Sequence, residues 1–189
     1  MSITTVDISE SAHEKQQLAQ PPVFIGMPKT DVLFQSEREW YPDRPHVLVI
    51  ACSDGRLQKS LDDFLNDHLN ITDYDRLFAP GGPGAFTPDG AEPVRSAQFL
   101  QELRFLVKIH GVERIILVFH SAAEGGPNDS ICGDYKRLWP NCDRLQIAEK
   151  QDRDLVEVLE LMGKNFPNVK IDSFRAEVTA ELHVQFVRL

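Results

Sequence analysis

Residues 46–57 read HVLVIACSDGRL. The run from Val47 to Cys52 is short, aliphatic and partly β-branched, so it predicts a buried strand and not a helix. The turn-forming SDGR follows, and leucine and phenylalanine then recur every three or four residues as far as Leu69, which predicts a helix. A cysteine therefore stands where a buried strand ends and a turn begins.

The alternation of strand and helix continues through the rest of the chain. Strands are predicted near residues 75–79, 113–120, 168–174 and 177–187, helices at 93–110 and about 144–164, and a loop at 121–135. This order is typical of an α/β domain with a mostly parallel central sheet flanked by helices.

The chain divides into an arm and a body. Residues 1–44 are polar and rich in proline, with only patchy apolar content. We interpret them as an N-terminal arm, and residues 45–189 as one α/β domain. At 189 residues and 42% hydrophobic composition, the chain suits a single hydrophobic core.

Composition argues against several classes of protein. The 29 acidic and 20 basic residues give a net charge of −9 without a basic cluster, so no nucleic-acid partner is expected. No apolar run reaches the roughly 20 residues that span a bilayer, so no membrane partner is expected. The first residues lack the pattern of a secretory signal, and a cytoplasmic location is predicted. The 3 cysteines do not form a disulfide framework.

Cysteine and histidine side chains meet at one edge of the predicted sheet. Cys52 closes the first strand and His120 the third, and in a parallel sheet the carboxyl ends of the strands carry the ligand site. Zn²⁺ binds thiolates and imidazoles in a tetrahedron. Cys132 is the natural third ligand and Cys142 its competitor. A lone cysteine or histidine is more often structural, so these residues alone leave both interpretations open.

Two stretches resemble the β-carbonic anhydrases. IACSDGRL is similar to their Cys-x-Asp-x-Arg signature, and SAQFLQELRFLVKIHGVERIILVFHS, residues 96–121, resembles the helix, Gly-Val turn and strand that deliver their histidine ligand. The likeness covers about residues 46–135. It departs from the family after His120: eleven residues, Ser121 to Ile131, separate His120 from Cys132 where the family usually has two. The resemblance thus requires a loop that bulges out and returns.

The resemblance implies a lyase that hydrates CO₂ reversibly to bicarbonate. Cys52, His120 and Cys132 would bind Zn²⁺, and an Asp54–Arg56 dyad would orient the zinc-bound hydroxide that attacks CO₂. The family also implies a homodimer or a higher homo-oligomer.

Three other functions remain open. The same scaffold resembles zinc hydrolases of CS₂ and COS, which are linear molecules like CO₂. A non-catalytic interaction module is the second alternative, if the loop keeps Cys132 away from the metal. Nucleotide binding through PGGPG, residues 80–84, is the weakest, because the loop lacks the GxGxxG pattern.

Overall fold

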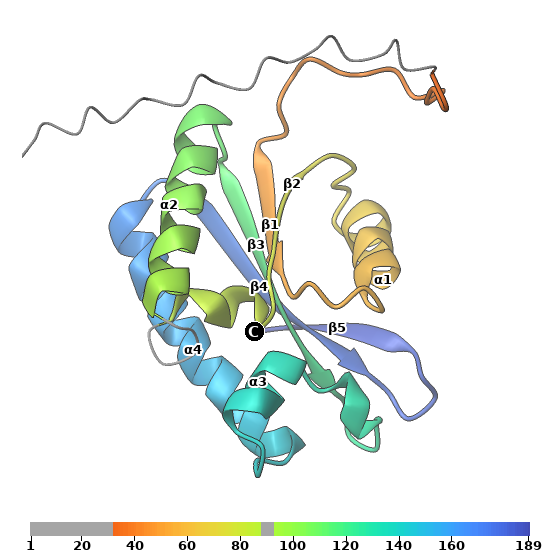
Figure 1. Cartoon of the computed structure of the whole chain (residues 1–189), viewed down its shortest axis with the longest axis vertical. Coiled ribbons are helices and arrows are strands. Elements are labelled where there is room, and N and C mark those ends of the chain that lie inside the picture. Colours follow the sequence, from red (N-terminus) through yellow and green to blue (C-terminus); the bar gives the residue numbers. More distant parts are fainter. Residues whose placement is uncertain (1–31, 88–92) are drawn as a thin grey trace, which may run out of the picture. The chain divides into compact units, whose positions relative to one another are not determined.

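Five strands form one sheet in the computed structural model, which describes residues 32–87 and 93–189. The order across the sheet is β2-β1-β3-β4-β5 (Figure 1). The first four strands are parallel, and β5 runs antiparallel to β4 at the edge. Their bounds are β1 (Val47–Ala51), β2 (Asp75–Phe78), β3 (Arg114–Ala122), β4 (Lys170–Val178) and β5 (Val184–Arg188). The predicted α/β class with a mostly parallel sheet is confirmed.

Helices cover both faces of this sheet. α2 and α4 pack on the face formed by Leu48 and Ile50, whereas α1 packs on the face formed by Val49 and Ala51 (Figure 1). Successive residues of β1 therefore serve opposite layers, as strand geometry requires. The helices are α1 (Gln58–Asp63), which continues as the π-helical η1 (Phe64–His68), α2 (Pro93–Ile109), α3 (Gly133–Leu138) and α4 (Arg144–Asn165).

The elements differ from the sequence prediction in two places. Residues 121–135 are not all loop: β3 runs on past His120 to Ala122, and the 3₁₀ helix η3 (Asn128–Ser130) and the start of α3 follow. The predicted last strand, 177–187, is not continuous: Glu177 and Val178 end β4, a tight turn follows, and β5 begins at Val184. The short helices could not be predicted, because their sequence is polar and glycine-rich and is too short for apolar residues to recur every three or four positions.

The described part of the arm carries little regular structure. Residues 32–44 contain neither helix nor strand, and residues 1–31 lie outside the described residues. The domain boundary between residues 44 and 45 stays a prediction.

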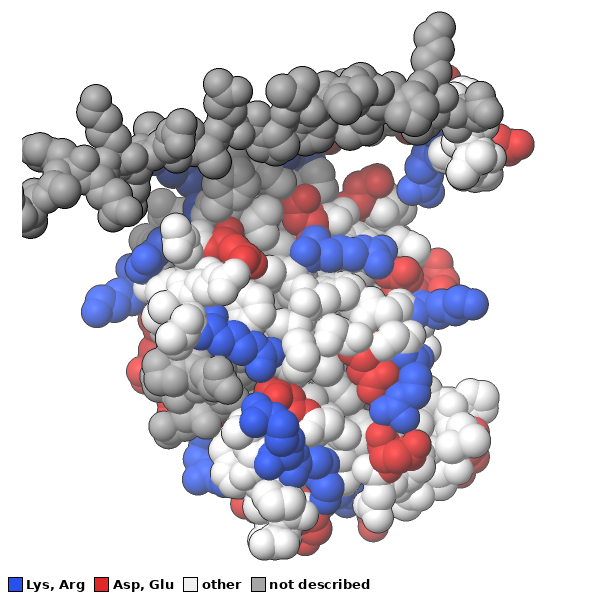
Figure 2. Space-filling model, viewed as in Figure 1, with Lys and Arg blue, Asp and Glu red and all other residues white. Residues whose placement is uncertain are grey.

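The surface of the body carries both signs of charge. Figure 2 shows Lys and Arg side chains interspersed with Asp and Glu on one face. Among the helices in residues 32–87 and 93–189, none is long and apolar enough to cross a membrane.

Candidate metal centre

Three ligand-type side chains converge at the carboxyl edge of β1 and β3. Cys52 follows β1, His120 lies in β3, and Cys132 directly precedes α3. One ligand atom from each lies within 4.8 Å of the other two. The two Sγ atoms are 3.9 Å apart. Two sulfurs bound at about 2.3 Å in a tetrahedron would be roughly 3.8 Å apart, so this spacing fits Zn²⁺.

The imidazole of His120 is oriented for a metal. Its Nδ1 lies 3.0 Å from the carbonyl oxygen of Ser130. Because a carbonyl only accepts, Nδ1 must carry the hydrogen, which leaves a lone pair on Nε2. The side chain is 3% exposed, and Nε2 has no hydrogen-bond partner among the described residues. A buried, unpartnered nitrogen is unfavourable unless it binds something, and metal-binding histidines commonly donate their other nitrogen in this way.

A buried polar chain supports the backbone of His120 from behind. Gln151 of α4 donates its Nε2 hydrogen to the His120 carbonyl oxygen at 2.9 Å. Arg175 of β4 in turn donates from Nε to Gln151 Oε1 at 3.0 Å, and it also pairs with Asp152. Gln151 and Arg175 are both buried, so the hydrogen bonds form in a medium that strengthens them. The histidine is thus tied to α4 and to β4.

The two cysteines hold one proton between them. The thiol of Cys132 donates a hydrogen bond to Cys52, and this bond lowers the pKa of Cys52 to about 4 although burial acts to raise it. The same bond, together with burial, raises the pKa of Cys132. Cys52 is therefore a thiolate at neutral pH. A dication among the three ligand atoms would favour loss of the second proton as well.

Asp54 and Arg56 form a bidentate pair beside the cluster. Arg56 Nη2 lies 2.7 Å from Asp54 Oδ2, and Arg56 Nε lies 3.0 Å from Asp54 Oδ1. The backbone N–H of Arg56 also donates to Oδ1, at 3.1 Å. These bonds lower the pKa of Asp54 to about 2, so the carboxylate is ionised at neutral pH. Each oxygen of Asp54 is held, which fixes the plane of the carboxylate.

The loop between His120 and Cys132 bulges out and returns. The N–H of Ala123 donates to Val178 O at 2.9 Å, which fastens the outgoing part to the end of β4. On the return, Arg56 contacts Asp129 twice: Nη1 lies 3.2 Å from Oδ2, and Nη2 lies 2.9 Å from the backbone oxygen. Gly126 passes so close to Val178 O that an added Cβ would lie 2.0 Å from it. The loop is therefore held against the site at both ends.

A glycine brings the segment after β2 against Cys52. This segment forms the buried 3₁₀ helix η2 (Gly82–Phe86). Gly82 has φ +58°, and a Cβ there would lie 2.9 Å from the backbone nitrogen of Cys52 and 3.2 Å from the Val118 carbonyl oxygen. The chain can approach the carboxyl ends of β1 and β3 this closely only without a side chain.

Gly82→Ala is accordingly expected to destabilise the protein by about 2 kcal/mol or more, from left-handed backbone strain and the clash at Cys52. Urea unfolding measures the change. Gly163→Ala in α4 is the control, because an added Cβ there meets nothing within 4 Å. That change should stabilise the helix by about 1 kcal/mol. Equal midpoints for wild type and Gly82→Ala would contradict the close approach.

A cavity of about 230 Å³ lies next to Asp54 and Arg56. Its other lining residues come from the start of the α1 segment, from the loop after β3 and from the β4–β5 hairpin: Leu57, Pro127, Asp129, Ser130, Val178, Leu182 and Val184. Most of this wall is apolar.

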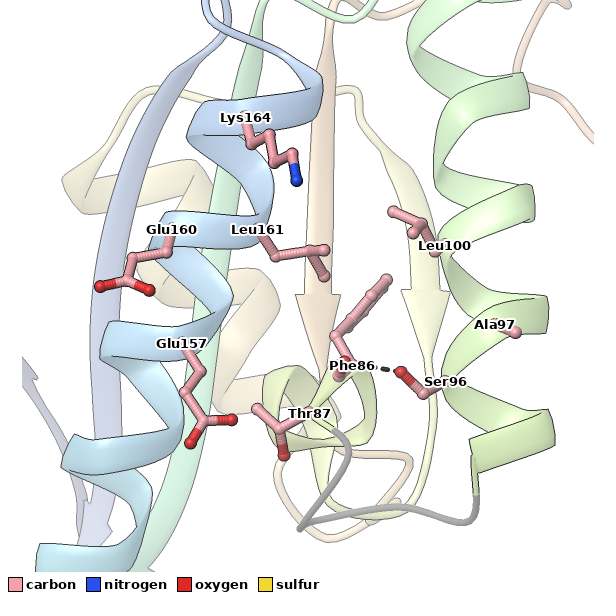
Figure 3. A pocket seen from close by; sticks show the side chains of 9 residues that line it. All are labelled: Phe86, Thr87, Ser96, Ala97, Leu100, Glu157, Glu160, Leu161 and Lys164. Carbon is pink, nitrogen blue, oxygen red and sulfur yellow. Dashed lines mark hydrogen bonds between the residues drawn. The ribbon is translucent and has the colours of Figure 1, made fainter.

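A second cavity, of about 450 Å³, lies between α2 and α4 (Figure 3). Phe86 and Leu161 point into it, and Ser96 donates a hydrogen bond to the Phe86 carbonyl oxygen at 2.6 Å. None of the three ligand-type residues lines it. The cavity beside Asp54 is not lined by these three residues either, but Asp54 and Ser130, which adjoin the cluster, belong to its wall.

The structure brings together the residues singled out in the sequence. Cys52, His120 and Cys132 meet at one point, and Asp54 pairs with Arg56. Cys142 is not part of the cluster; its carbonyl oxygen accepts from Lys136 Nζ at 3.1 Å. The roles assigned to these residues stay predictions.

Sequence reasoning missed Ser130, Gln151 and the walls of the cavity. The burial of Gln151 could have been predicted, because this residue lies at helical spacing between the buried Ile147 and Leu155 of α4. A polar residue on such a face needs a buried partner, and that partner is the His120 backbone. Ser130 contacts His120 through its backbone carbonyl, and a backbone contact of this kind cannot be predicted from a pattern of side chains.

No family model and no curated protein matches the chain. Solved structures do match it. CafA of Aspergillus fumigatus is 13% identical over 77% of this chain and 76% of its own, with a TM-score of 0.44. Isoform I of Trichomonas vaginalis is 15% identical over 82% and 88%, with a TM-score of 0.38. A structure from work on two tetrameric enzymes of Sordaria macrospora is 12% identical over 77% and 81%, with a TM-score of 0.42.

All three are β-carbonic anhydrases. The resemblance to β-carbonic anhydrases expected from the sequence is confirmed by the meeting of Cys52, His120 and Cys132 at one point. Because the identities are only 12–15%, the chemistry of this chain has to be argued from its own residues.

Proposed function

We propose that this chain is a zinc enzyme that hydrates CO₂ reversibly to bicarbonate. One observation carries the proposal: two sulfurs and a buried, unpartnered imidazole nitrogen converge within 4.8 Å. Such a set of two thiolates and one imidazole suits Zn²⁺ better than the oxygen-preferring Mg²⁺ or Ca²⁺. Three protein ligands are also the number found in catalytic zinc sites, which keep one position open.

Cys52, His120 and Cys132 would hold the ion. When bound, Zn²⁺ supplies a water whose pKa lies near neutrality and which serves as the nucleophile for CO₂. Two thiolates reduce the positive charge at the site, so groups around the ligands matter for that acidity. Ser130 contributes by fixing the tautomer of His120, and Gln151 by holding its backbone.

Asp54 would accept a hydrogen bond from the nucleophile and so orient it toward the substrate. Arg56 holds both oxygens of this carboxylate, which keeps it ionised and at a fixed angle. In some β-carbonic anhydrases the corresponding aspartate instead moves onto the metal when its arginine pair is broken. Here the pair is formed, which would keep Asp54 on Arg56 and away from the ion.

Metal analysis and stopped-flow CO₂ hydration on one preparation test this proposal. The expected result is one zinc per chain with hydration activity. Protein that takes up no zinc under reducing conditions with zinc present would overturn it and leave the interaction module. Zinc without CO₂ hydration would also overturn it.

Hydrolysis of COS or CS₂ is the second candidate. The observation that favours it is the largely apolar cavity of about 230 Å³ beside Asp54, since COS and CS₂ are larger than CO₂ and have more apolar surface to bury there. Release of H₂S from each gas by the zinc-loaded protein measures it. Turnover of COS that exceeds that of CO₂ under matched conditions would assign the chain to this class.

A homo-oligomer is a further part of the proposal. α2 carries three exposed apolar residues: Val94 is 79% exposed, Phe105 56% and Ile109 51%. Exposed apolar residues on one helix favour an interface. The enzymes of Sordaria macrospora are described as tetrameric. Light scattering after size exclusion would give the number of chains.

A further inference from the structure

Three separate segments wall the cavity beside Asp54 with apolar side chains. Leu57 precedes α1, Pro127 belongs to the loop after β3, and the β4–β5 hairpin adds Val178, Leu182 and Val184. The cavity of about 230 Å³ exceeds what a three-atom molecule needs, since a water occupies about 30 Å³ of liquid volume. The space can hold an apolar group of several carbon atoms.

Leu182 adopts an unfavourable backbone conformation at the edge of this cavity. Its φ is +65°, in the left-handed region where glycine or asparagine is normally found. The tight turn around it is closed by bonds from Thr179 N to His183 O at 2.8 Å and from Leu182 N to Thr179 O at 3.0 Å. Leucine also leaves 72% of its surface exposed here. A turn that needed only stability would carry glycine, and strained residues cluster where ligands are held.

Two residues that adjoin the metal cluster also line this cavity. Asp54 lines it and lies two residues after Cys52, and Ser130 lines it while its carbonyl accepts from His120 Nδ1. The hairpin and the loop after β3 are joined by the bond from Ala123 to Val178, and a Cβ on Gly125 would lie 3.5 Å from Ala180. A molecule in the cavity therefore contacts the groups that support the cluster.

We infer that this cavity is a binding site for the apolar group of a small ligand, about four to six carbon atoms long, and that Leu182 determines its specificity. The polar rim of Asp54, Arg56 and Asp129 faces the polar end of such a ligand. The inference rests on the proposed function only in placing the cavity next to a reacting centre. The binding itself requires no turnover.

The homologous primary alcohols from ethanol to hexanol are suitable probes. Their binding to the metal-free and zinc-loaded chain is followed by the methyl NMR signals of Leu57, Val178, Leu182 and Val184. Each added methylene should tighten binding about fourfold, which is the equivalent of about 0.8 kcal/mol per buried CH₂. Equal affinities along the series, or shifts confined to other methyl groups, would overturn the inference.

Leu182→Gly separates a ligand-binding role from a structural one. The change relieves the left-handed strain, so the midpoint of thermal unfolding should rise. The increase in binding affinity for each added methylene should fall below about twofold. Leu145→Ala, which removes an exposed leucine of α4 outside the cavity, should leave the alcohol series unchanged. A lower midpoint with unchanged alcohol binding in Leu182→Gly would mean that Leu182 serves only the turn.

The two proposals fail independently in this design. If affinity does not increase along the alcohol series while CO₂ hydration is intact, the inferred binding site is wrong and the proposed function stands. Graded alcohol binding in a chain that takes up no zinc removes the proposed function and leaves the binding site.

Discussion

Cys132→Ser is expected to lower zinc affinity by at least about 100-fold and to abolish CO₂ hydration. Replacement of a group that only supports a ligand already costs about 10–100-fold in affinity, and a lost thiolate removes a bond to the ion itself. Cys132 is buried 3.9 Å from Cys52, where a serine oxygen binds zinc poorly. Zinc titration with a competing chelator gives the affinity, and stopped-flow hydration gives the rate.

Cys142→Ser is the matched control for this experiment. Cys142 is a half-buried thiol of the same chain, but it does not belong to the cluster. Its replacement should leave both zinc content and hydration at the wild-type level. If Cys142→Ser loses zinc while Cys132→Ser keeps it, the proposed ligand set is wrong.

Asp54→Asn is expected to reduce the hydration rate by about 10²–10³-fold while the protein keeps its zinc. The substitution preserves the shape of the side chain but removes the charge that pairs with Arg56 and one of its acceptor oxygens. Loss of one well-placed hydrogen-bonding group in an active site commonly costs that much. Rate and metal content have to be measured on the same sample, because zinc retention excludes a trivial loss of the site.

Asp129→Asn provides the comparison. Asp129 also pairs with Arg56, at 3.2 Å, but its side chain is 79% exposed. Exposed ion pairs contribute about 0–1 kcal/mol, so a small effect on rate is expected. Wild-type activity in Asp54→Asn would show that the dyad has no part in the reaction. Equal losses in both variants would mean that Arg56, and not Asp54, is the group that matters.

Much of the candidate site could be predicted from the sequence, because the ends of buried strands are marked by the end of an aliphatic run. Cys52 and His120 each follow an aliphatic run that forms a buried parallel strand, and parallel strands present their carboxyl ends at one edge. Asp54 and Arg56 are close in sequence, so their pairing needs no long-range information. These parts of the site depend on local pattern and on one general rule of topology.

The remainder depends on contacts that leave no periodic pattern. The return path of the loop after His120 is fixed by single bonds, such as Ala123 to Val178 and Arg56 to Asp129. Backbone groups take part in both of these bonds, and every residue type has a backbone. The position of Leu182 in the cavity wall also depends on a left-handed turn, where leucine is seldom found.

The length of the loop between His120 and Cys132 has a thermodynamic consequence. Loop-closure entropy grows only with the logarithm of length, so extending the interval from two residues to eleven costs about 1.5 kcal/mol. The few hydrogen bonds that fasten the loop to β4 and to Arg56 are of the order needed to offset this. An interval between two metal ligands can thus lengthen during evolution with little loss of stability. The ligand geometry is kept, while the wall of the neighbouring pocket becomes free to change.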